Sequence, residues 1–248
     1  MTNALFDLTG QVALVTGTSR GLGQYFARTL AKAGADLILT SRRKDDLLPF
    51  VDEIEALGRR AVPLALDVRD QHSIEAMAEA AQESFGHIDI LVNNAGVAIQ
   101  GDGLPGSTDL DVVRRTFETN FFGTVAVTQA LLPLVKKSSA GRIVNVSSGL
   151  GSIALNADPN WDYAAVKLIG YNGSKAALNM FTVLLAADLK DTGIKVNAVN
   201  PGYTATDLNG NSGHQSIEEG AAETVRMAQI PDNGPTGGFT STEGVEPW

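Results

Sequence analysis

The chain has 248 residues, a formal net charge of −9 and no cysteine. Without cysteine it can form neither disulfides nor thiolate–metal sites, and the scattered His72, His87 and His214 show no metal-ligand spacing. The acidic balance argues against a nucleic-acid-binding protein, which needs a basic face. No apolar run reaches the roughly 20 residues of a membrane span, and the N-terminus shows no signal peptide. We therefore expect a cytoplasmic, single-domain protein that binds no metal, nucleic acid or membrane.

Short apolar runs alternate with longer stretches of helical periodicity along the chain. The apolar runs lie at residues 12–16, 37–40, 62–66, 88–92, 143–146 and 196–199. Between them, apolar residues recur at helical spacing at 22–33, 47–57, 74–85, 112–135 and 171–189. The short runs are apolar at consecutive positions, which is typical of parallel strands buried between two helix layers. We predict one α/β domain over residues 1–248, a Rossmann-like doubly wound sheet of about seven parallel strands with helices on both faces.

The first apolar run leads into a glycine-rich turn at residues 16–23. Glycines allow a tight strand-to-helix turn and the close approach of a diphosphate, and the helix N-terminus offers free N–H groups. A glycine-rich turn without a ligand is the alternative, but the flanking strand and helix favour a nucleotide. The residues predicted to bind the phosphates are Gly17, Ser19, Arg20, Gly21, Leu22 and Gly23.

The tip of the second strand carries arginines instead of the carboxylate that holds the ribose 2′-hydroxyl in NAD sites. Guanidinium groups suit a 2′-phosphate, which favours NADP(H) over NAD(H), unless these arginines are only solvated. After the third strand, a carboxylate either accepts from the adenine amino group or caps the next helix. The residues predicted around the ribose and adenine are Ser41, Arg42, Arg43, Asp67 and Val68, with Arg20 nearby.

An ordered set of short motifs covers nearly the whole chain. It consists of residues 16–23, Asn93-Asn94-Ala95-Gly96, Asn120, Ser148, Tyr171-x-x-x-Lys175 and Pro201-Gly202. Together these motifs resemble the short-chain dehydrogenase/reductase family. The resemblance implies a catalytic tetrad of Asn120, Ser148, Tyr171 and Lys175, in which Asn120 joins a water relay and Lys175 also holds the nicotinamide ribose. It implies further cofactor contacts at Asn94, Ala95, Gly96, Pro201, Gly202, Thr204 and Thr206.

The tyrosine and lysine of this set also suit proton transfer on chemical grounds. Residues four apart share a helix face, and we expect the charge of Lys175 to lower the pKa of Tyr171 from about 10. Tyr171 can then donate a proton to a nascent alkoxide, or accept one in the oxidative direction. Ser148 would hydrogen-bond the substrate oxygen and orient it.

A second pair, Tyr163 and Lys167, has the same spacing. Gly170 and Gly173 make a helix that starts at Tyr163 unfavourable. The apolar stripe that follows Tyr171 and the distance from Lys175 to the Pro-Gly motif match the family. We therefore predict that Tyr171 is the reactive tyrosine and that the earlier pair is incidental.

The interval between Ser148 and Tyr171 is roughly ten residues longer than in many family members. We place the insertion within residues 155–168, where monomeric carbonyl reductases resemble this chain, as they do near its C-terminus. Specificity is expected from loops at 97–107, 149–170 and 203–220. The residues predicted to contact substrate are Ser148, Leu155, Trp161, Tyr171 and Tyr203, although the apolar ones could instead pack beneath their loops.

The N-terminal part departs from that branch. Residues 5–97 look more like gluconate-type dehydrogenases, whereas residues from about 117 onward look like carbonyl reductases. Ordinary divergence and a composite chain joined within residues 97–115 both account for this difference. Comparing the relatives of the two parts, split at Gly106, would separate these explanations.

The leading functional hypothesis is NADPH-dependent reduction of a small or medium ketone or aldehyde, with Tyr171 as general acid/base. One alternative is an NADP-dependent sugar-acid or polyol dehydrogenase that works oxidatively. Another is a non-catalytic nucleotide-sensing regulator, against which the intact tetrad argues. Many relatives form dimers or tetramers through the two long helices at 112–135 and 171–189. The resemblance therefore leaves two alternatives open: a homo-oligomer through these helices, or a protein in which the insertion covers part of that surface.

Overall fold

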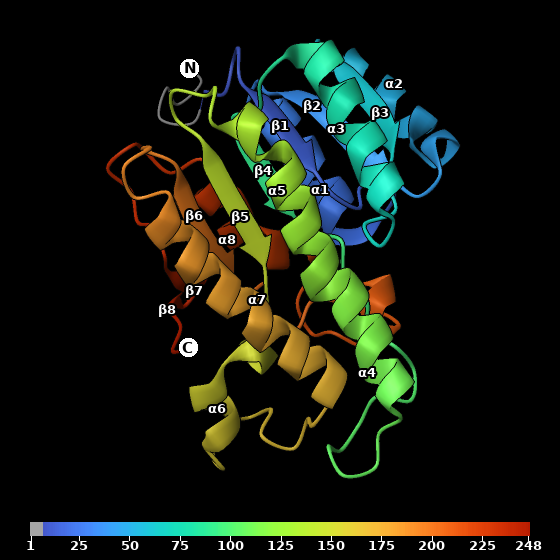
Figure 1. Cartoon of the computed structure of the whole chain (residues 1–248), viewed down its shortest axis with the longest axis vertical. Helices are drawn as coiled ribbons and strands as arrows, with labels where there is room; N and C mark the ends of the chain where they lie inside the picture. The colour runs from blue at the N-terminus through green and yellow to red at the C-terminus, as the bar shows by residue number, and fades with distance from the viewer. Residues whose placement is uncertain (1–6) are drawn as a thin grey trace.

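The computed structural model describes residues 7–248 and shows an eight-stranded sheet flanked by helices (Figure 1). The strands are β1 (Val12–Val15), β2 (Asp36–Ser41), β3 (Ala61–Ala65), β4 (Ile90–Asn93), β5 (Arg142–Val146), β6 (Lys195–Val199), β7 (Phe239–Ser241) and β8 (Gly244–Val245). Their order is β3-β2-β1-β4-β5-β6-β7-β8, and every pair is parallel except β7–β8. This order confirms the predicted doubly wound sheet. The antiparallel β8 is an addition to the parallel strands that we expected.

Residues 1–6 lie outside the described residues. Most of the N-terminus considered for a signal peptide falls there, as does the start of the gluconate-type segment.

Helices cover both faces of the sheet. They are α1 (Gly21–Lys32), α2 (Leu48–Ala56), α3 (Gln71–Phe85), α4 (Leu110–Phe117), α5 (Thr124–Val135), α6 (Ile153–Ala157), α7 (Ile169–Asp188) and α8 (Ile217–Ala228). One apolar cluster joins α1, α2 and α8 to the sheet, and a second joins α3, α5 and α7 to the opposite face. Within residues 7–248, no helix combines the length and the apolar character needed to cross a membrane.

The alternation of side chains along each strand explains why the strands are apolar throughout. In β1, Val12 and Leu14 enter one cluster, whereas Ala13 and Val15 enter the other. All four are buried. Consecutive strand residues point to opposite faces, so a sheet covered on both sides needs apolar residues at every position.

Helix α8 was not among the predicted helices. A capping box starts it: the Ser216 hydroxyl accepts from the Glu219 N–H at 3.2 Å, and the Glu219 carboxylate accepts from the Ser216 N–H at 2.8 Å. The S-x-x-E pattern is a sequence signal for a helix start. Helix α8 packs beside α1 and completes that layer of the sheet.

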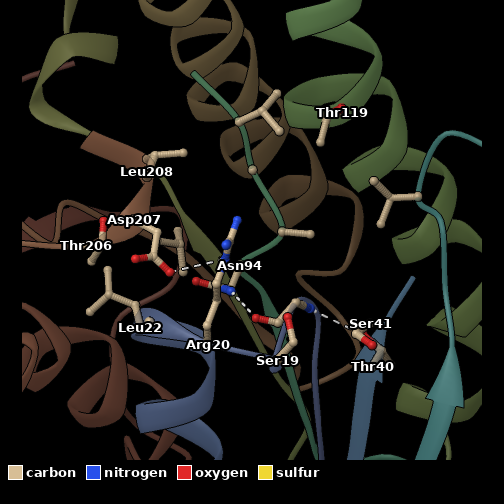
Figure 2. A pocket seen from close by; sticks show the side chains of 18 of the residues that line it. Ser19, Arg20, Leu22, Thr40, Ser41, Asn94, Thr119, Thr206, Asp207 and Leu208 are labelled. Atoms are coloured by element: carbon tan, nitrogen blue, oxygen red, sulfur yellow. Dashed lines mark hydrogen bonds and ion pairs between the residues drawn. The ribbon is translucent and has the colours of Figure 1, made fainter. Parts of the chain in front are cut away.

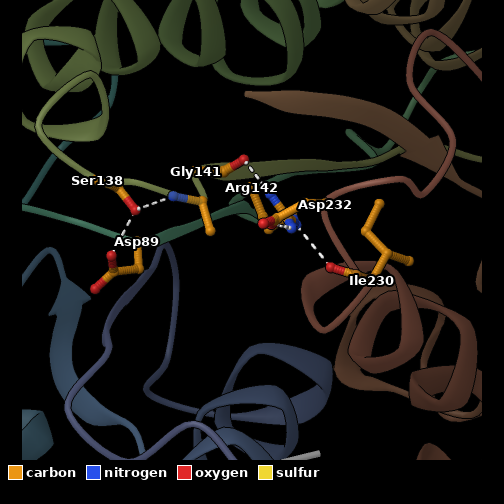
Figure 3. Close-up of polar contacts among 7 residues, drawn as sticks. Asp89, Ser138, Gly141, Arg142, Ile230 and Asp232 are labelled. Atoms are coloured by element: carbon orange, nitrogen blue, oxygen red, sulfur yellow. Dashed lines mark hydrogen bonds and ion pairs between the residues drawn. The ribbon is translucent and has the colours of Figure 1, made fainter. Parts of the chain in front are cut away.

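Polar contacts join the amino ends of the central strands (Figure 3). The buried Asp89 carboxylate accepts from the Val12 N–H at 2.8 Å and from the Ser138 hydroxyl. The buried Arg142 guanidinium donates to the Ile230 carbonyl at 2.8 Å and to Asp232 at 2.8 Å. Each of these two buried charged side chains therefore has hydrogen-bonding partners within the protein.

Candidate active site

A cleft with a volume of about 320 Å³ lies at the opposite edge, where the carboxyl ends of β1 to β6 meet (Figure 2). Ligands of open α/β sheets bind at this edge. The predicted cofactor residues that line it are Gly17, Ser19, Arg20, Gly21, Leu22, Gly23, Ser41, Arg42, Asp67, Val68, Asn94, Ala95, Gly96, Tyr171, Lys175, Pro201 and Thr206. Three others, Arg43, Gly202 and Thr204, are not among the lining residues.

The glycine-rich turn has the geometry that a phosphate site needs. Gly17 and Gly21 adopt φ of +73° and +60°, which glycine tolerates without strain. A Cβ on Gly23 would lie 2.2 Å from the Gly17 carbonyl oxygen, so the turn has no room for a side chain there. The Asn94 amide donates to the Thr16 and Gly17 carbonyls at 2.8 and 3.2 Å and holds the turn against β4.

The start of α1 also fits a phosphate group. No side chain caps this helix, and its first turn contains no acidic residue. The first N–H groups of a helix have no intrahelical acceptor, and here no capping side chain accepts from them either. They therefore favour an anion. The diphosphate of a nicotinamide dinucleotide fits the residues present here.

The arginines around the cleft have different partners. Arg42 lines the cleft. Arg20 also lines it, and its Nε lies 3.3 Å from a carboxylate oxygen of Asp207 (Figure 2). Arg43 instead donates to both carboxylate oxygens of Asp46 at 3.0 and 2.7 Å. The structure thus does not place Arg43 at the cofactor cleft, because a 3₁₀-helical turn, Lys44–Leu47, brings Asp46 beside it.

Asp67 lies in the cleft and does not cap the next helix. The cap of α3 is Asp70, whose carboxylate accepts from the His72 N–H at 3.2 Å. Asp67 is paired with the Arg69 guanidinium, which lowers the pKa of Asp67 to about 2. The carboxylate therefore remains ionised at the adenine end that the sequence predicted.

Lys175 lies on α7 with its ammonium group buried against β5. Its Nζ donates to the Val146 carbonyl at 2.8 Å, and burial lowers the pKa of Lys175 to about 8. This Nζ lies 5.7 Å from the centroid of the Tyr171 ring. The lysine thus faces the tyrosine, as their spacing on one helix predicted.

The pKa of Tyr171 shifts in the direction opposite to the predicted one. Burial raises the pKa of Tyr171 above 10, while its hydrogen bond with Ser148 acts in the lowering direction. The phenol therefore favours its neutral form in this structure. The sequence correctly paired Tyr171 with Lys175, but the spacing carried no information about burial of the hydroxyl.

Asn120 lies in a π-helical turn, Glu118–Gly123, which interrupts the helix expected at 112–135. The buried Asn120 amide accepts from the Val97 N–H at 2.8 Å and donates to the Val97 carbonyl at 2.9 Å. It also donates to the Ser174 hydroxyl at 3.0 Å. Such turns are common at functional sites. Here the turn aims Asn120 at the loop after β4 and at the helix that carries Lys175.

The second tyrosine–lysine pair lies outside any helix. Tyr163 is in a turn, where its ring packs edge-on against Trp161 and Tyr203 at centroid distances of 5.5 and 6.0 Å. Lys167 donates to the Asn156 carbonyl at 3.2 Å. The two residues therefore do not share a helix face.

Of the predicted substrate residues, Tyr171 lines the cleft, whereas Ser148, at the start of the turn Gly149–Gly151, is not among the lining residues. Trp161 belongs to the insertion and lies 3.4 Å from the position of a Cβ on Gly149, next to Ser148. Leu155, on α6, and Tyr203, after β6, are partly exposed. None of these three is among the residues that line the cleft.

The structure also brings unexpected residues to the site. Asp102 accepts hydrogen bonds from the first turn of α7. Further cleft-lining residues that were not named individually from the sequence are Thr40, Leu66, Arg69, Val97, Thr119, Val146, Ser147, Asp207 and Leu208. Val97, Asp207 and Leu208 lie in two of the loops expected to determine specificity. Thr40, Leu66 and Val146 end predicted strands, whereas Arg69, Thr119 and Ser147 reach the cleft through sheet order and loop packing.

Fold and cleft together define a dinucleotide-binding α/β protein with a tyrosine and a lysine at the site. The family model of short chain dehydrogenases matches residues 11–217. "Short-chain dehydrogenase anuI" of Penicillium roqueforti is 37% identical over 227 residues, which cover 89% of this chain and 89% of that protein. The (+)-neomenthol dehydrogenase of Arabidopsis thaliana is 33% identical, with coverage of 96% of this chain and 98% of that one.

Among solved structures, the NADPH-bound carbonyl reductase from chicken fatty liver superposes with a TM-score of 0.84 at 26% identity. The match covers 97% of this chain and 100% of that one. The chain belongs to the short-chain dehydrogenase family. It is therefore an oxidoreductase for alcohol or ketone substrates, and its family uses a nicotinamide cofactor and small-molecule substrates.

Proposed function

We propose that this protein reduces a small or medium ketone or aldehyde with NADPH, with Tyr171 as the proton donor. The observation that carries the proposal is the common cleft. It brings the glycine-rich turn, Arg42 and the Tyr171–Lys175 pair of α7 together. The names of two relatives, a neomenthol dehydrogenase and a carbonyl reductase, agree with alcohol–carbonyl chemistry.

NADPH, when bound, would supply the hydride. The residues of the chain would manage the proton and the orientation. Ser148 would donate to the carbonyl oxygen of the substrate and hold it beside Tyr171. Tyr171 would then give its proton to the alkoxide as it forms.

The protonation states suit a tyrosine that acts as a proton donor. The phenol of Tyr171 carries its proton at neutral pH, as an acid must, and burial, which raises the pKa of Tyr171, strengthens this preference. With a pKa of about 8, Lys175 is mostly charged at pH 7. Its charge would stabilise the phenolate that remains after proton donation. An oxidative enzyme would instead need the phenolate as its starting form.

The preference for NADPH rests on Arg42 at the tip of β2. The strand ends without a carboxylate to hold a free 2′-hydroxyl, and a guanidinium binds a 2′-phosphate with a planar pair of donors. Arg20 is a second candidate, but it would have to exchange Asp207 for the phosphate.

A panel of aryl ketones, aliphatic ketones and aldehydes, assayed with NADPH and NADH in parallel, tests the proposal. We expect carbonyl-dependent oxidation of NADPH, with NADH much less effective. A matching panel of polyols and sugar acids with NADP⁺ tests the rival oxidative function. Turnover with polyols but with none of the carbonyl compounds would contradict the proposal.

A further inference from the structure

The first turn of α7 carries Tyr171 but has no cap of its own. Leu168, the residue before the helix, makes no side-chain capping hydrogen bond. The first N–H groups of a helix have no intrahelical acceptor and need partners from elsewhere. Here the partners come from the loop after β4, which lies 69 residues before Tyr171 in the chain.

Three consecutive N–H groups of α7 bind this loop. The Ile169 N–H donates to the Gly103 carbonyl at 2.9 Å. The next two donate to the two oxygens of one carboxylate: the Gly170 N–H reaches Asp102 Oδ1 at 2.9 Å, and the Tyr171 N–H reaches Asp102 Oδ2 at 2.7 Å. Asp102 thus caps the helix from a distant segment and binds the backbone of Tyr171 itself.

The residues around Gly170 pack closely against the Asp102 carboxylate. A Cβ on Gly170 would lie 3.0 Å from Asp102 Oδ2 and 3.2 Å from the Thr116 hydroxyl oxygen. Glycine at this position therefore lets the carboxylate approach the helix. Asp102 Oδ1 also accepts from the Gly103 N–H at 2.9 Å, and no ion pair within residues 7–248 involves Asp102. Backbone N–H groups are the partners to which this half-buried carboxylate is bound.

The same loop binds Asn120 at its other end. Both backbone polar groups of Val97 are hydrogen-bonded to the Asn120 amide, and Val97 lines the cleft. Residues 97–103 therefore form a short strap between two members of the predicted tetrad. Movement of this strap would change the position of Tyr171 relative to Ser148.

We propose that Asp102 is a positioning residue for the reaction: its carboxylate fixes the first turn of α7 and thereby the phenol of Tyr171. The proposal rests on the proposed function, because it requires Tyr171 to act as the acid/base. Asp102 does not touch the reacting atoms. Its effect would be geometric, and misplacement of a reacting group by about 1 Å costs on the order of 100-fold in rate.

The test compares Asp102→Ala with wild type, using NADPH and the best carbonyl substrate at a temperature well below both melting transitions. We expect kcat to fall by about 10- to 100-fold, because the proton donor is misplaced. The solvent deuterium isotope effect on kcat should rise as proton transfer becomes rate-limiting. The stoichiometry of NADPH binding should stay unchanged and the Kd should change much less than kcat, because the glycine-rich turn, which lies outside the strap, is untouched. Asp102→Asn keeps one acceptor oxygen and should recover part of kcat.

Asp109→Ala is the matched control. Asp109 caps α4 and accepts from the Asp111 N–H at 2.8 Å, so its loss also removes a capping carboxylate. This control should lower Tm as Asp102→Ala does, yet keep kcat and the isotope effect of wild type. Wild-type kcat and isotope effect in Asp102→Ala, or an equal loss of kcat in Asp109→Ala, would overturn the positioning role. If Asp102→Ala does not fold, Asp102→Asn is compared with wild type and with Asp109→Ala in the same measurements.

Failure of the proposed function has a different signature. A wild-type protein that turns over only polyols with NADP⁺ would overturn the proposed function, and the Asp102 variants would then be compared in that direction. A wild-type protein without turnover in either direction would overturn both proposals.

Discussion

At the scale of single residues, burial determines the chemistry of the site. It raises the pKa of Tyr171 and lowers the pKa of Lys175 to about 8, so both groups are biased toward their neutral forms. Perturbed groups of this kind in a cleft are typical of functional sites. The bias suits a tyrosine that must donate a proton, while a lysine with a pKa of about 8 still carries its charge at pH 7.

The two tyrosine–lysine pairs provide an internal comparison. Tyr171→Phe removes the proton donor, and general acid catalysis contributes about 10²- to 10⁴-fold, so we expect kcat to fall by that order. NADPH binding, measured by fluorescence titration, should be retained. Tyr163→Phe should keep most of the activity, because Tyr163 packs in a turn against Trp161 and Tyr203. Loss of activity in Tyr163→Phe with retention of activity in Tyr171→Phe would show that Tyr163, and not Tyr171, is the proton donor.

Burial of Lys175 also predicts how stability depends on pH. The pKa of Lys175 in the folded protein, about 8, lies below the ordinary 10.5, so the unfolded chain binds more protons between these pH values. The free energy of unfolding should therefore rise from about pH 8 upward, and the full pKa difference corresponds to roughly 3 kcal/mol. Denaturant unfolding at several pH values up to 10 would measure the rise. Lys175→Met should abolish it, and an equal rise in that variant would assign the effect to other groups.

Neighbouring arginines allow a matched test of cofactor choice. Arg42 lines the cleft, whereas Arg43 is held by Asp46. Arg42→Ala should lower kcat/KM for NADPH by about 10- to 100-fold, the value of one or two charge-assisted hydrogen bonds. It should leave kcat/KM for NADH nearly unchanged. Arg43→Ala should alter neither, and a larger effect of Arg43→Ala on NADPH would show that Arg43 leaves Asp46 when the cofactor binds.

At the scale of secondary-structure elements, helix starts and helix irregularities determine where the site residues lie. The glycine-rich turn leaves the start of α1 without a side-chain capping hydrogen bond, Asp102 of the strap caps α7, and the π-helical turn aims Asn120 at that strap. In each case a short segment between regular elements positions a group that the strands and helices alone would leave elsewhere. The strands are common to many α/β proteins, whereas these short segments determine which side chains reach the site.

The close packing of the glycine-rich turn predicts a sharp effect of one methyl group. Gly23→Ala would place a Cβ 2.2 Å from the Gly17 carbonyl oxygen and 2.5 Å from the Asn94 amide nitrogen, so the turn must open. Overpacking of this kind costs about 1–3 kcal/mol. We expect a lower Tm and weaker NADPH binding in fluorescence titrations. Gly106→Ala, where a Cβ meets no atom within 4 Å, is the control and should change neither property. Unaltered NADPH affinity in Gly23→Ala would contradict the role of the turn.

At the scale of the whole molecule, one sheet unites the two parts that the sequence analysis assigned to different branches of the family. Strands β1 and β4 lie within residues 5–97, β5 lies in the part from about residue 117 onward, and β4 pairs with β5 over four residues. The suggested junction at residues 97–115 includes the Asp102 strap. Any joining event would therefore have had to preserve the contacts of that strap with Asn120 and α7. The composite origin stays a prediction, tested by comparing the relatives of the two parts.

The outer surface of α7 predicts self-association. Met180 and Leu184 are one helical turn apart and each is 60% exposed, while Phe122 in the neighbouring π-helical turn is 52% exposed. Exposed apolar side chains grouped in this way are typical of protein interfaces. We expect wild-type protein to be a dimer or tetramer by light scattering and Leu184→Glu to lower its mass. Leu57→Glu, on an exposed leucine after α2, should leave the mass unchanged. A monomeric wild-type protein would contradict this expectation.

Much of the fold was predictable because it depends on local patterns. Apolar runs and helical periodicity located the six principal strands and most helices, since both are set by which side chains face the core. Strands β7 and β8 and helices α6 and α8 were not located from the sequence, although Ser216 and Glu219 carried a capping signal for α8. The helix at 112–135 was expected to be regular, because nothing in its periodicity marks the extra residue of a π-helical turn.

The amino-acid sequence alone determined the α/β class, and it predicted a phosphate-binding turn and favoured Tyr171 over Tyr163, because motif order and helical spacing are properties of a linear chain. The tertiary structure decided which arginine faces the cleft, whether Asp67 or Asp70 caps α3, and in which direction the pKa of Tyr171 moves. It also revealed Asp102, which reaches Tyr171 across 69 residues of sequence. These outcomes depend on burial and on contacts between distant segments. Both arise only when the strands assemble into the sheet and bring their loops to one edge.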